Sequence, residues 1–156
     1  MTTFLDTSVL VAGLIDFGPQ SAPSQSVMHA VSERRVDGPA TAWHCCLEFF
    51  SVATRLPPEF RLSPGDAVRL LEEEVFDRMA VHELPAADRI SMLQAIVRDG
   101  VAGGRIYDAH IGEVARAAQA QVVITDNRRH FLSALRHGLR VETPAEYLAA
   151  LKKKSR

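Results

Sequence analysis

The stretch Val122-Val123-Ile124-Thr125-Asp126-Asn127 carries the clearest fold signal in the sequence. Its apolar first half predicts a buried strand at residues 122–124, and an aspartate follows just beyond it. The start of the chain has the same arrangement, because the short apolar segment Thr3-Phe4-Leu5 is followed at once by Asp6. We therefore expect two strands that each end next to an acid.

Helical apolar patterns and short strands alternate along the rest of the chain. We expect strands at residues 3–5, 40–41, 79–82, 122–124 and 139–141. We expect helices at residues 8–15, 21–35, 44–55, 63–75, 85–97, 107–118 and 143–151, and a short helix at 131–135 after a turn at 126–129. Strands that alternate with crossing helices indicate an α/β fold, with a short parallel central sheet and helices on both faces.

Length and composition indicate one ordinary globular domain. The chain has 156 residues, of which 47% are hydrophobic and 24% charged, with a net charge of -1. We assign residues 1–151 to the domain and residues 152–156 to a basic C-terminal tail. The sequence has no leader-like segment and no long apolar run, so we expect a cytoplasmic protein without membrane contact.

The positions of lysine and cysteine exclude several kinds of chemistry. All three lysines lie at 152–154, which leaves none for a P-loop, for a Schiff base or beside a phosphorylated aspartate. Cys45 and Cys46 are adjacent, so an intrachain disulfide is not expected between them. Because no cysteine or histidine spacing is typical of zinc, we interpret both cysteines as small buried apolar residues.

Acidic residues lie where the predicted sheet would open to ligands. Asp6 and Asp126 follow strands, Asp108 lies in the first turn of a helix after a glycine-rich loop, and Glu48 is one turn into another helix. In parallel sheets, ligands bind beyond the carboxyl ends of the strands. Two charges 4 Å apart repel by about 4 kcal/mol at an effective dielectric near 20. With no lysine nearby, a hard divalent cation is the expected partner, either Mg²⁺ or Mn²⁺.

Each of these acids also has a structural interpretation of its own. Asp6 could cap the following helix, Asp108 could complement the helix dipole, and Asp126 with Asn127 could form a turn. Glu48 could pair with Arg55 or face water. The coincidence of four acids at one edge of the sheet is what favours a functional site.

Several segments together resemble the PIN-domain nucleases, and most closely the VapC toxins of bacterial type II toxin–antitoxin pairs. The resemblance covers nearly the whole chain. The segments that carry it are Leu5-Asp6-Thr7-Ser8, Glu48 on its helix, Gly104-Arg105-Ile106-Tyr107-Asp108-Ala109 and Ile124-Thr125-Asp126-Asn127-Arg128-Arg129-His130-Phe131.

The resemblance implies a three-layer α/β/α PIN-like fold and metal-dependent hydrolysis of RNA phosphodiesters. It implies that Asp6, Glu48, Asp108 and Asp126 form the catalytic, metal-binding acidic quartet, with Thr7 or Ser8 and Asn127 in support. A metal-activated water would attack the phosphorus in line and leave a 5′-phosphate and a 3′-hydroxyl.

RNA binding needs basic side chains, because an acidic site repels the phosphates. Residues 1–78 hold 11 acids and 6 bases, whereas residues 79–156 hold 8 acids and 12 bases. In this second half Arg105, Arg128 and Arg129, with His130, flank two of the acids and are candidates to hold the RNA backbone. At least one of them is expected to be a solvated turn residue instead.

The resemblance also implies partners. Family members dimerise and are inhibited by an antitoxin, so we expect a homodimer and a VapB-like antitoxin. Apolar residues of the early helices, with Leu70 and Leu71, could line a groove for it, although they equally fit a core. Two other functions remain open, namely a metal-dependent phosphatase of another class and a non-catalytic PIN-like binding module.

Overall fold

A parallel sheet of five short strands forms the centre of the protein. The computed structural model describes residues 1–131 and 138–154. The strands are β1 (Thr3–Leu5), β2 (Pro39–Ala42), β3 (Ala80–His82), β4 (Val122–Ile124) and β5 (Arg140–Glu142). They lie in the order β3-β2-β1-β4-β5, and each neighbouring pair is parallel. The predicted parallel α/β fold is therefore confirmed.

Helices connect the strands in the predicted alternation. The α-helices are α1 (Thr7–Leu14), α2 (Ala22–Ser32), α3 (Trp43–Ala53), α4 (Pro64–Leu70), α5 (Arg89–Arg98), α6 (Arg105–Ala117) and α8 (Pro144–Lys154). Shorter turns are the 3₁₀ segments η1 (Pro19–Ser21), η3 (Ala86–Asp88) and η4 (Arg128–Phe131), and the π-helical segment η2 (Leu71–Phe76), which continues α4. Leu132 and Leu135 of the helix predicted at 131–135 lie outside the described residues.

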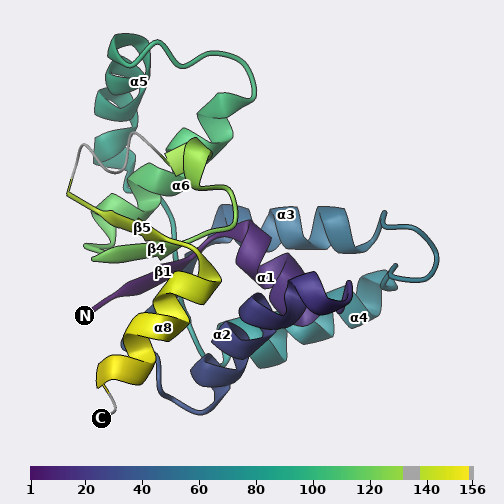
Figure 1. Ribbon diagram of the computed structural model, residues 1–156. Helices are drawn as coiled ribbons and strands as arrows, with labels where there is room; N and C mark the ends of the chain where they lie inside the picture. Colours follow the sequence, from purple (N-terminus) through teal and green to yellow (C-terminus); the bar gives the residue numbers. More distant parts are fainter. Residues whose placement is uncertain (132–137, 155–156) are drawn as a thin grey trace.

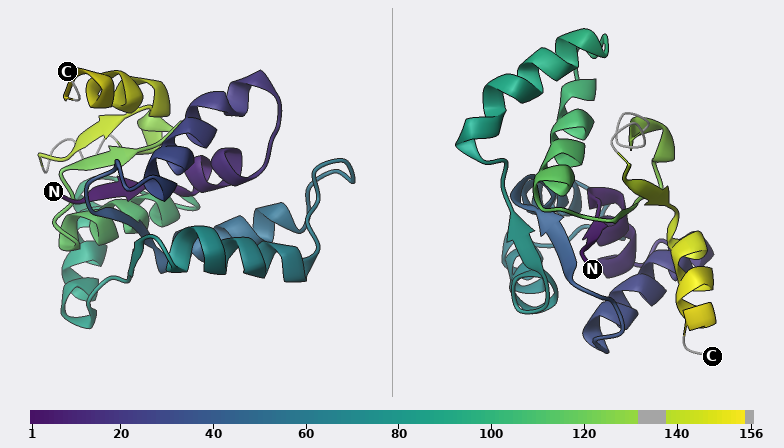
Figure 2. Two further views of the ribbon diagram at one scale, coloured as in Figure 1. Left: turned by 90° about the horizontal axis from the view of Figure 1, so that it is seen from below. Right: turned by 90° about the vertical axis from the view of Figure 1, so that its left-hand side faces the viewer.

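The helices cover the sheet from two sides. Figure 1 shows α1, α2 and α8 on one side of the sheet and α6, with α5 beyond it, on the other. The views in Figure 2 agree, and they also show α3 and α4 extending side by side away from the sheet. The arrangement is the predicted three-layer α/β/α architecture.

Local sequence signals explain where the helices begin and end. The Ser63 hydroxyl accepts the Asp66 N–H at 3.1 Å, as expected of an N-cap. Thr143 and Glu146 cap α8 reciprocally through each other's backbone N–H groups. Several helix ends differ from prediction by a few residues. α2 ends at Ser32, just before Arg34 turns left-handed with φ of 57°. α8 runs to Lys154 and not to residue 151, so the three lysines lie on its last turn.

The apolar residues of the early helices belong to the core. Val9, Leu10 and Val27 are completely buried, and Leu71 is nearly so. Val11, Leu14 and Leu70 are partly buried against the same core. Cys45 and Cys46 are buried free thiols, as predicted, and burial raises the pKa of Cys45 to about 12. Among the described helices, none is long and apolar enough to cross a bilayer.

Gly13 marks the closest approach of α1 to α2. A Cβ at this position would lie 2.4 Å from the Met28 Cγ and 3.0 Å from the Ser24 carbonyl oxygen. At Gly65, in the first turn of α4, an added Cβ would meet nothing within 4 Å. Both glycines are helical, so the same substitution tests packing against helix propensity.

We predict opposite effects of alanine at these two glycines. Gly13→Ala should lower the free energy of unfolding by about 1–3 kcal/mol, because the methyl group forces α2 away from α1. Gly65→Ala should be neutral or stabilising by up to about 1 kcal/mol, because alanine is the better helix former. Urea denaturation followed by circular dichroism measures both. Equal effects at the two sites would contradict the close approach of α1 and α2.

Candidate active site

The pairing of β1 with β4 positions the first acid. Leu5 pairs with Ile124, and the Asp6 N–H donates to the Ile124 carbonyl at 3.0 Å. Asp6 and Thr125 therefore leave the sheet side by side at its carboxyl edge. Strands β2 and β3 lie on one side of β1, and strands β4 and β5 lie on its other side, so the strand order reverses at β1. Such a reversal of strand order is where open α/β sheets bind ligands.

Hydroxyl groups hold the Asp6 carboxylate in a buried position. Asp6 is only 4% exposed, and its Oδ2 accepts bonds from the Thr125 hydroxyl at 2.8 Å and the Ser8 hydroxyl at 3.0 Å. The same two hydroxyls accept backbone N–H groups of the next loop, Ser8 from Asp126 and Thr125 from Asn127. The loop after β4 is thereby fixed onto the carboxylate. Thr7 is also buried, but its hydroxyl has no hydrogen bond to any of the described residues.

Asp108 interacts electrostatically with two other acids, because it is repelled by Glu48 and in turn repels Asp6. Desolvation is the main cause that raises the pKa of Asp108, and repulsion from Glu48 adds to it. Burial raises the pKa of Asp6 most; its two hydroxyl bonds lower it, and repulsion from Asp108 raises it further. Glu48 on α3 and Asp108 on α6 line the same groove, and Asp6, directly after β1, is near enough to Asp108 to be affected by its charge.

Two histidines partner the acids of this group. His130 Nδ1 lies 3.0 Å from the Asp108 carboxylate, and His44 Nε2 lies 2.6 Å from Glu48 one turn along α3. Both attractions lower the pKa of Asp108. The alternative pairing of Glu48 with Arg55 is replaced by the pair with His44.

Asp126 occupies the same edge but faces a different neighbour. Its backbone is linked to Asp6 through Ser8, whereas its Oδ2 is 3.5 Å from the Ser24 hydroxyl on α2. Partial desolvation raises the pKa of Asp126, and the Ser24 hydroxyl lowers it. Across residues 1–131 and 138–154, no three acidic, histidine or cysteine side chains are already arranged as a metal cage. The four acids thus share an edge without converging on one point.

The predicted basic residues have different environments. Arg128 donates to the Val141 carbonyl at 3.1 Å and pairs with Glu146, so it ties η4 to β5 and α8. This arginine has protein partners, unlike the solvated turn residue expected among the candidates. Arg105 lies at the start of α6 and Arg129 lies in η4. Both are exposed, so a polyanion can reach their side chains.

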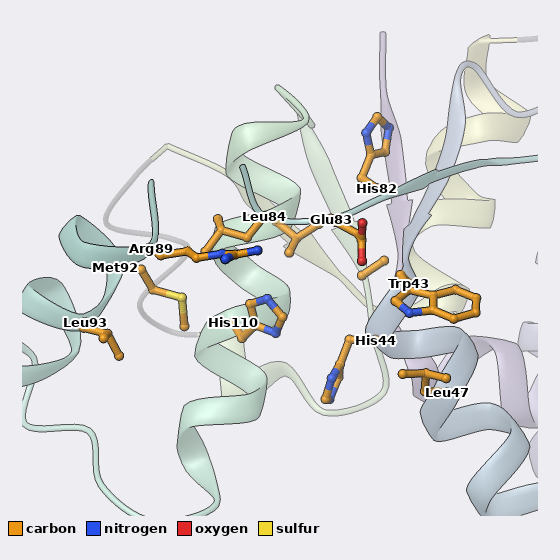
Figure 3. Close-up of a pocket in the computed structure, with 12 residues that line it drawn as sticks. Trp43, His44, Leu47, His82, Glu83, Leu84, Arg89, Met92, Leu93 and His110 are labelled. Carbon is orange, nitrogen blue, oxygen red and sulfur yellow. The ribbon is translucent and has the colours of Figure 1, made fainter. Parts of the chain in front are cut away.

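Two hollows meet near His44. An apolar cavity of about 400 Å³ lies between α3, the segment after β3 and α5, and it is lined by Trp43, Leu47, Met92 and Leu93 among others. Figure 3 shows His44 and His110 reaching from α3 and α6 into the space between these helices. His44 also lines a second hollow, an open groove of about 410 Å³ whose lining includes Glu48 and Asp108.

Sequence reasoning missed the residues that hold the acids. Thr125 was quoted only as part of a motif, Ser24 was not considered, and His44 was given no role beside the acids. The spacing of four residues between His44 and Glu48 was a readable signal for an ion pair on one helix face. The Thr125 contact depends on strand register, and the Ser24 contact depends on how α2 packs, neither of which is visible in the sequence.

Comparison with known proteins agrees with the geometry. A family model described as PIN domain matches residues 2–129. Ribonuclease VapC40 from Mycobacterium tuberculosis is 31% identical over 123 residues, which cover 79% of this chain and 85% of that protein. Among solved structures, PAE2754 from Pyrobaculum aerophilum superposes with a TM-score of 0.63 at 19% identity over 98% of both chains.

A further solved structure, VapBC-1 from nontypeable Haemophilus influenzae, gives a TM-score of 0.62 at 16% identity. The match covers 93% of this chain and 99% of that one. The structural matches establish the fold, and the sequence matches establish the relationship. The chain belongs to the PIN-domain family and is related there to the VapC ribonucleases.

Proposed function

We propose that this protein is a divalent-metal-dependent endoribonuclease and the toxin of a VapBC-type toxin–antitoxin pair. The observation that carries the proposal is the buried Asp6 carboxylate, held by two hydroxyls at the strand-order reversal and repelled by Asp108, which lines an open groove with Glu48. The relationship to a protein named Ribonuclease VapC40 supports the choice of RNA as substrate.

The chemistry of the donor set fits Mg²⁺ or Mn²⁺. The acids offer carboxylate oxygens. Burial is the main cause that raises the pKa values of Asp6 and Asp108, and repulsion from Asp108 on Asp6 and from Glu48 on Asp108 raises them further. A hard cation relieves this repulsion and prefers oxygen ligands. Asp6 and Asp108 would hold it, with Glu48 and Asp126 acting directly or through water. When bound, such an ion supplies hydroxide at neutral pH and stabilises charge on a leaving oxygen.

The chain's own residues position this chemistry. The Thr125 and Ser8 hydroxyls fix one oxygen of Asp6, so the carboxylate does not rotate freely. Their second bonds fix the loop that carries Asp126 and Asn127. Arg105 and Arg129 are placed to hold phosphates against the repulsion of the acids. Because water would be the nucleophile, the products carry a 5′-phosphate and a 3′-hydroxyl.

A homodimer and a VapB-like antitoxin complete the proposal. The similarity to VapBC-1 supports an antitoxin partner. An apolar stripe on α5 supports association with a second copy: Ile90 is 66% exposed, Leu93 49% and Val97 79%, and all three lie on one helix face. A cytoplasmic location fits an enzyme that acts on cellular RNA.

We predict metal-dependent cleavage that requires Asp6. The purified protein, free of antitoxin, should cut RNA with Mg²⁺ or Mn²⁺ and stop in EDTA. Asp6→Asn should lower the cleavage rate by more than about a hundredfold, because it removes a charged ligand, and Thr125→Val by about 10- to 100-fold, because it removes the group that orients this ligand. Gel analysis of labelled RNA measures the cleavage rates of the wild-type protein and of both variants.

A matched variant and a second substrate control this experiment. Thr41 is another buried threonine, and its hydroxyl donates to the Leu5 carbonyl at 2.8 Å. Thr41→Val should leave cleavage nearly unchanged. Hydrolysis of a phosphomonoester without RNA cleavage would indicate a phosphatase, and RNA binding without any hydrolysis would indicate a non-catalytic module. Cleavage that persists in EDTA would exclude the metal mechanism.

We predict that the buried Asp6 carboxylate makes the metal-free protein less stable as pH rises, because burial, with a smaller repulsion from Asp108, raises the pKa of Asp6. Because the pKa of Asp6 is raised in the folded state, the folded protein binds this proton more tightly than the unfolded chain. The resulting stability is complete below the unfolded pKa of about 3.9 and is lost as pH rises through the folded pKa. Asp6→Asn should therefore have the higher Tm in EDTA near neutral pH, with the difference vanishing towards about pH 4.

The same melting curves test the cation. Mg²⁺ should raise the Tm of the wild-type protein, because an ion that binds only the folded state stabilises it. It should raise the Tm of the Asp6→Asn variant much less. An equal increase in both proteins would show that Mg²⁺ does not bind at Asp6.

We predict that the α5 stripe joins two copies of the chain. Light scattering coupled to size exclusion should give the mass of a dimer. The double variant Leu93→Glu, Val97→Glu should give a monomer, because it places charges in an apolar contact. Ser91→Glu adds a charge elsewhere on the exposed surface of α5 and should leave the dimer intact. A wild-type monomer, or a dimeric double variant, would exclude this interface.

A further inference from the structure

The open groove between α3 and α6 extends beyond the acids. Glu48 and Asp108 lie at one part of its lining, and Ser51, Arg55 and Tyr107 continue the lining away from them. Glu48, Ser51 and Arg55 follow one another at helical spacing along α3 and just past its end. A Cβ added at Gly104, on the opposite wall, would meet nothing within 4 Å, so this part of the groove is open.

Tyr107 offers a flat aromatic surface at the edge of this groove. Its ring stacks on that of His44, with centroids 5.7 Å apart and planes only 10° from parallel. His44 is itself held by Glu48 at 2.6 Å and by an edge contact with His110. Tyr107 nevertheless remains 57% exposed. One face of the ring is thus supported by the protein and the other is available to a ligand.

Tyr107 is next in sequence to Asp108, one of the candidate catalytic acids, and directly precedes it on α6. Both residues line the same groove, so a planar group stacked on Tyr107 would lie in the groove that contains this acid. The exposed ring contributes little to the core and offers a contact surface to a ligand.

Arg55 supplies a cation further along the same groove. It is exposed and forms no ion pair with the side chains of residues 1–131 and 138–154, although Glu48 lies two turns before it. Arg55 follows Glu48 by seven residues, lies just past the end of α3 and lines the same groove. Its guanidinium group is thus available to an anion bound in this groove.

We infer that the groove between α3 and α6 binds single-stranded RNA beside the cleaved bond, with a nucleobase stacked on Tyr107 and an adjacent phosphate held by Arg55. The inference rests on the proposed ribonuclease activity and adds a subsite to it. Aromatic rings and arginines in one groove are how proteins hold unpaired nucleotides, because every base has a face to stack and every linkage carries a charge.

The subsite explains how a mostly acidic edge retains its substrate. The acids repel phosphate groups. They do not repel a nucleobase, because the base is uncharged, so stacking on Tyr107 is not weakened by their charge. Tyr107 thus provides attraction next to Asp108 without neutralising the acids that would bind the metal. It also requires the base to be unstacked from its neighbours, so the groove favours unpaired RNA over duplex.

Two labelled oligomers separate stacking from phosphate binding. One is a short polyuridylate, and the other is an abasic ribose-phosphate oligomer of the same length and charge. Binding to the full-length protein is measured by fluorescence anisotropy in EDTA, with the Asp6→Asn substitution in every variant so that the RNA stays intact. The variants are Tyr107→Leu, Tyr107→Phe and Arg55→Gln.

Tyr107→Leu should weaken binding of polyuridylate by roughly five- to a hundredfold and leave the abasic oligomer unchanged. Tyr107→Phe, which keeps the ring, should restore the affinity. Arg55→Gln should weaken both oligomers equally and reduce the slope of log affinity against log salt by about 0.7, the value for one phosphate on a single strand. Arg140→Gln is the control, because this exposed arginine lies at the opposite, amino edge of the sheet.

The outcomes distinguish this inference from the proposed activity. Equal losses for both oligomers with Tyr107→Leu, or none for either, would overturn the subsite even if the protein cuts RNA. A base-dependent loss in a protein that never cuts RNA would uphold the subsite and overturn the nuclease. If neither oligomer binds, but an antitoxin peptide binds in a manner that needs Tyr107, the groove is a protein-binding surface and the inference is wrong.

Discussion

The pairing of Leu5 with Ile124 is the constraint on which the rest of the site depends. It places Asp6 and Thr125 as neighbours at the carboxyl edge, where one hydroxyl can reach one carboxylate. A slip of one residue between β1 and β4 would turn these side chains to opposite faces of the sheet. Because both strands are short and completely buried, their apolar side chains fix the register, so hydrophobic packing sets the position of a charged group.

A buried carboxylate is costly, and here the cost is only partly compensated. Hydrogen bonds to a charged group contribute about 1.5–3 kcal/mol each, whereas an unpaired buried charge costs several kcal/mol. Asp6 has two hydroxyl donors and a repulsive neighbour in Asp108, and its pKa stays raised. The fold therefore keeps a group that is unfavourable in the free protein. A site of this kind gains stability from binding a cation, which links affinity for the ion to the stability of the fold.

The sequence alone predicted the sheet, its helices and the edge at which the acids gather. These follow from local apolar patterns and from the rule that parallel strands share a carboxyl edge. It did not predict that Thr125 would hold Asp6, because this contact needs the register of two strands more than a hundred residues apart. It did not predict that the Asp126 carboxylate would face Ser24, because that depends on how α2 packs. It also did not place Arg128 against Glu146, a contact made by the final helix.

The choice of base near the acids has a physical consequence. Histidines, not lysines, partner Asp108 and Glu48. An ammonium group at this place would stay charged and pair permanently with the carboxylates. The sequence has no lysine before residue 152, so the bases in contact with these two acids are imidazoles. An arginine in contact with the acids would likewise neutralise the proposed metal site. Arg55 is exposed and forms no ion pair with the side chains of residues 1–131 and 138–154.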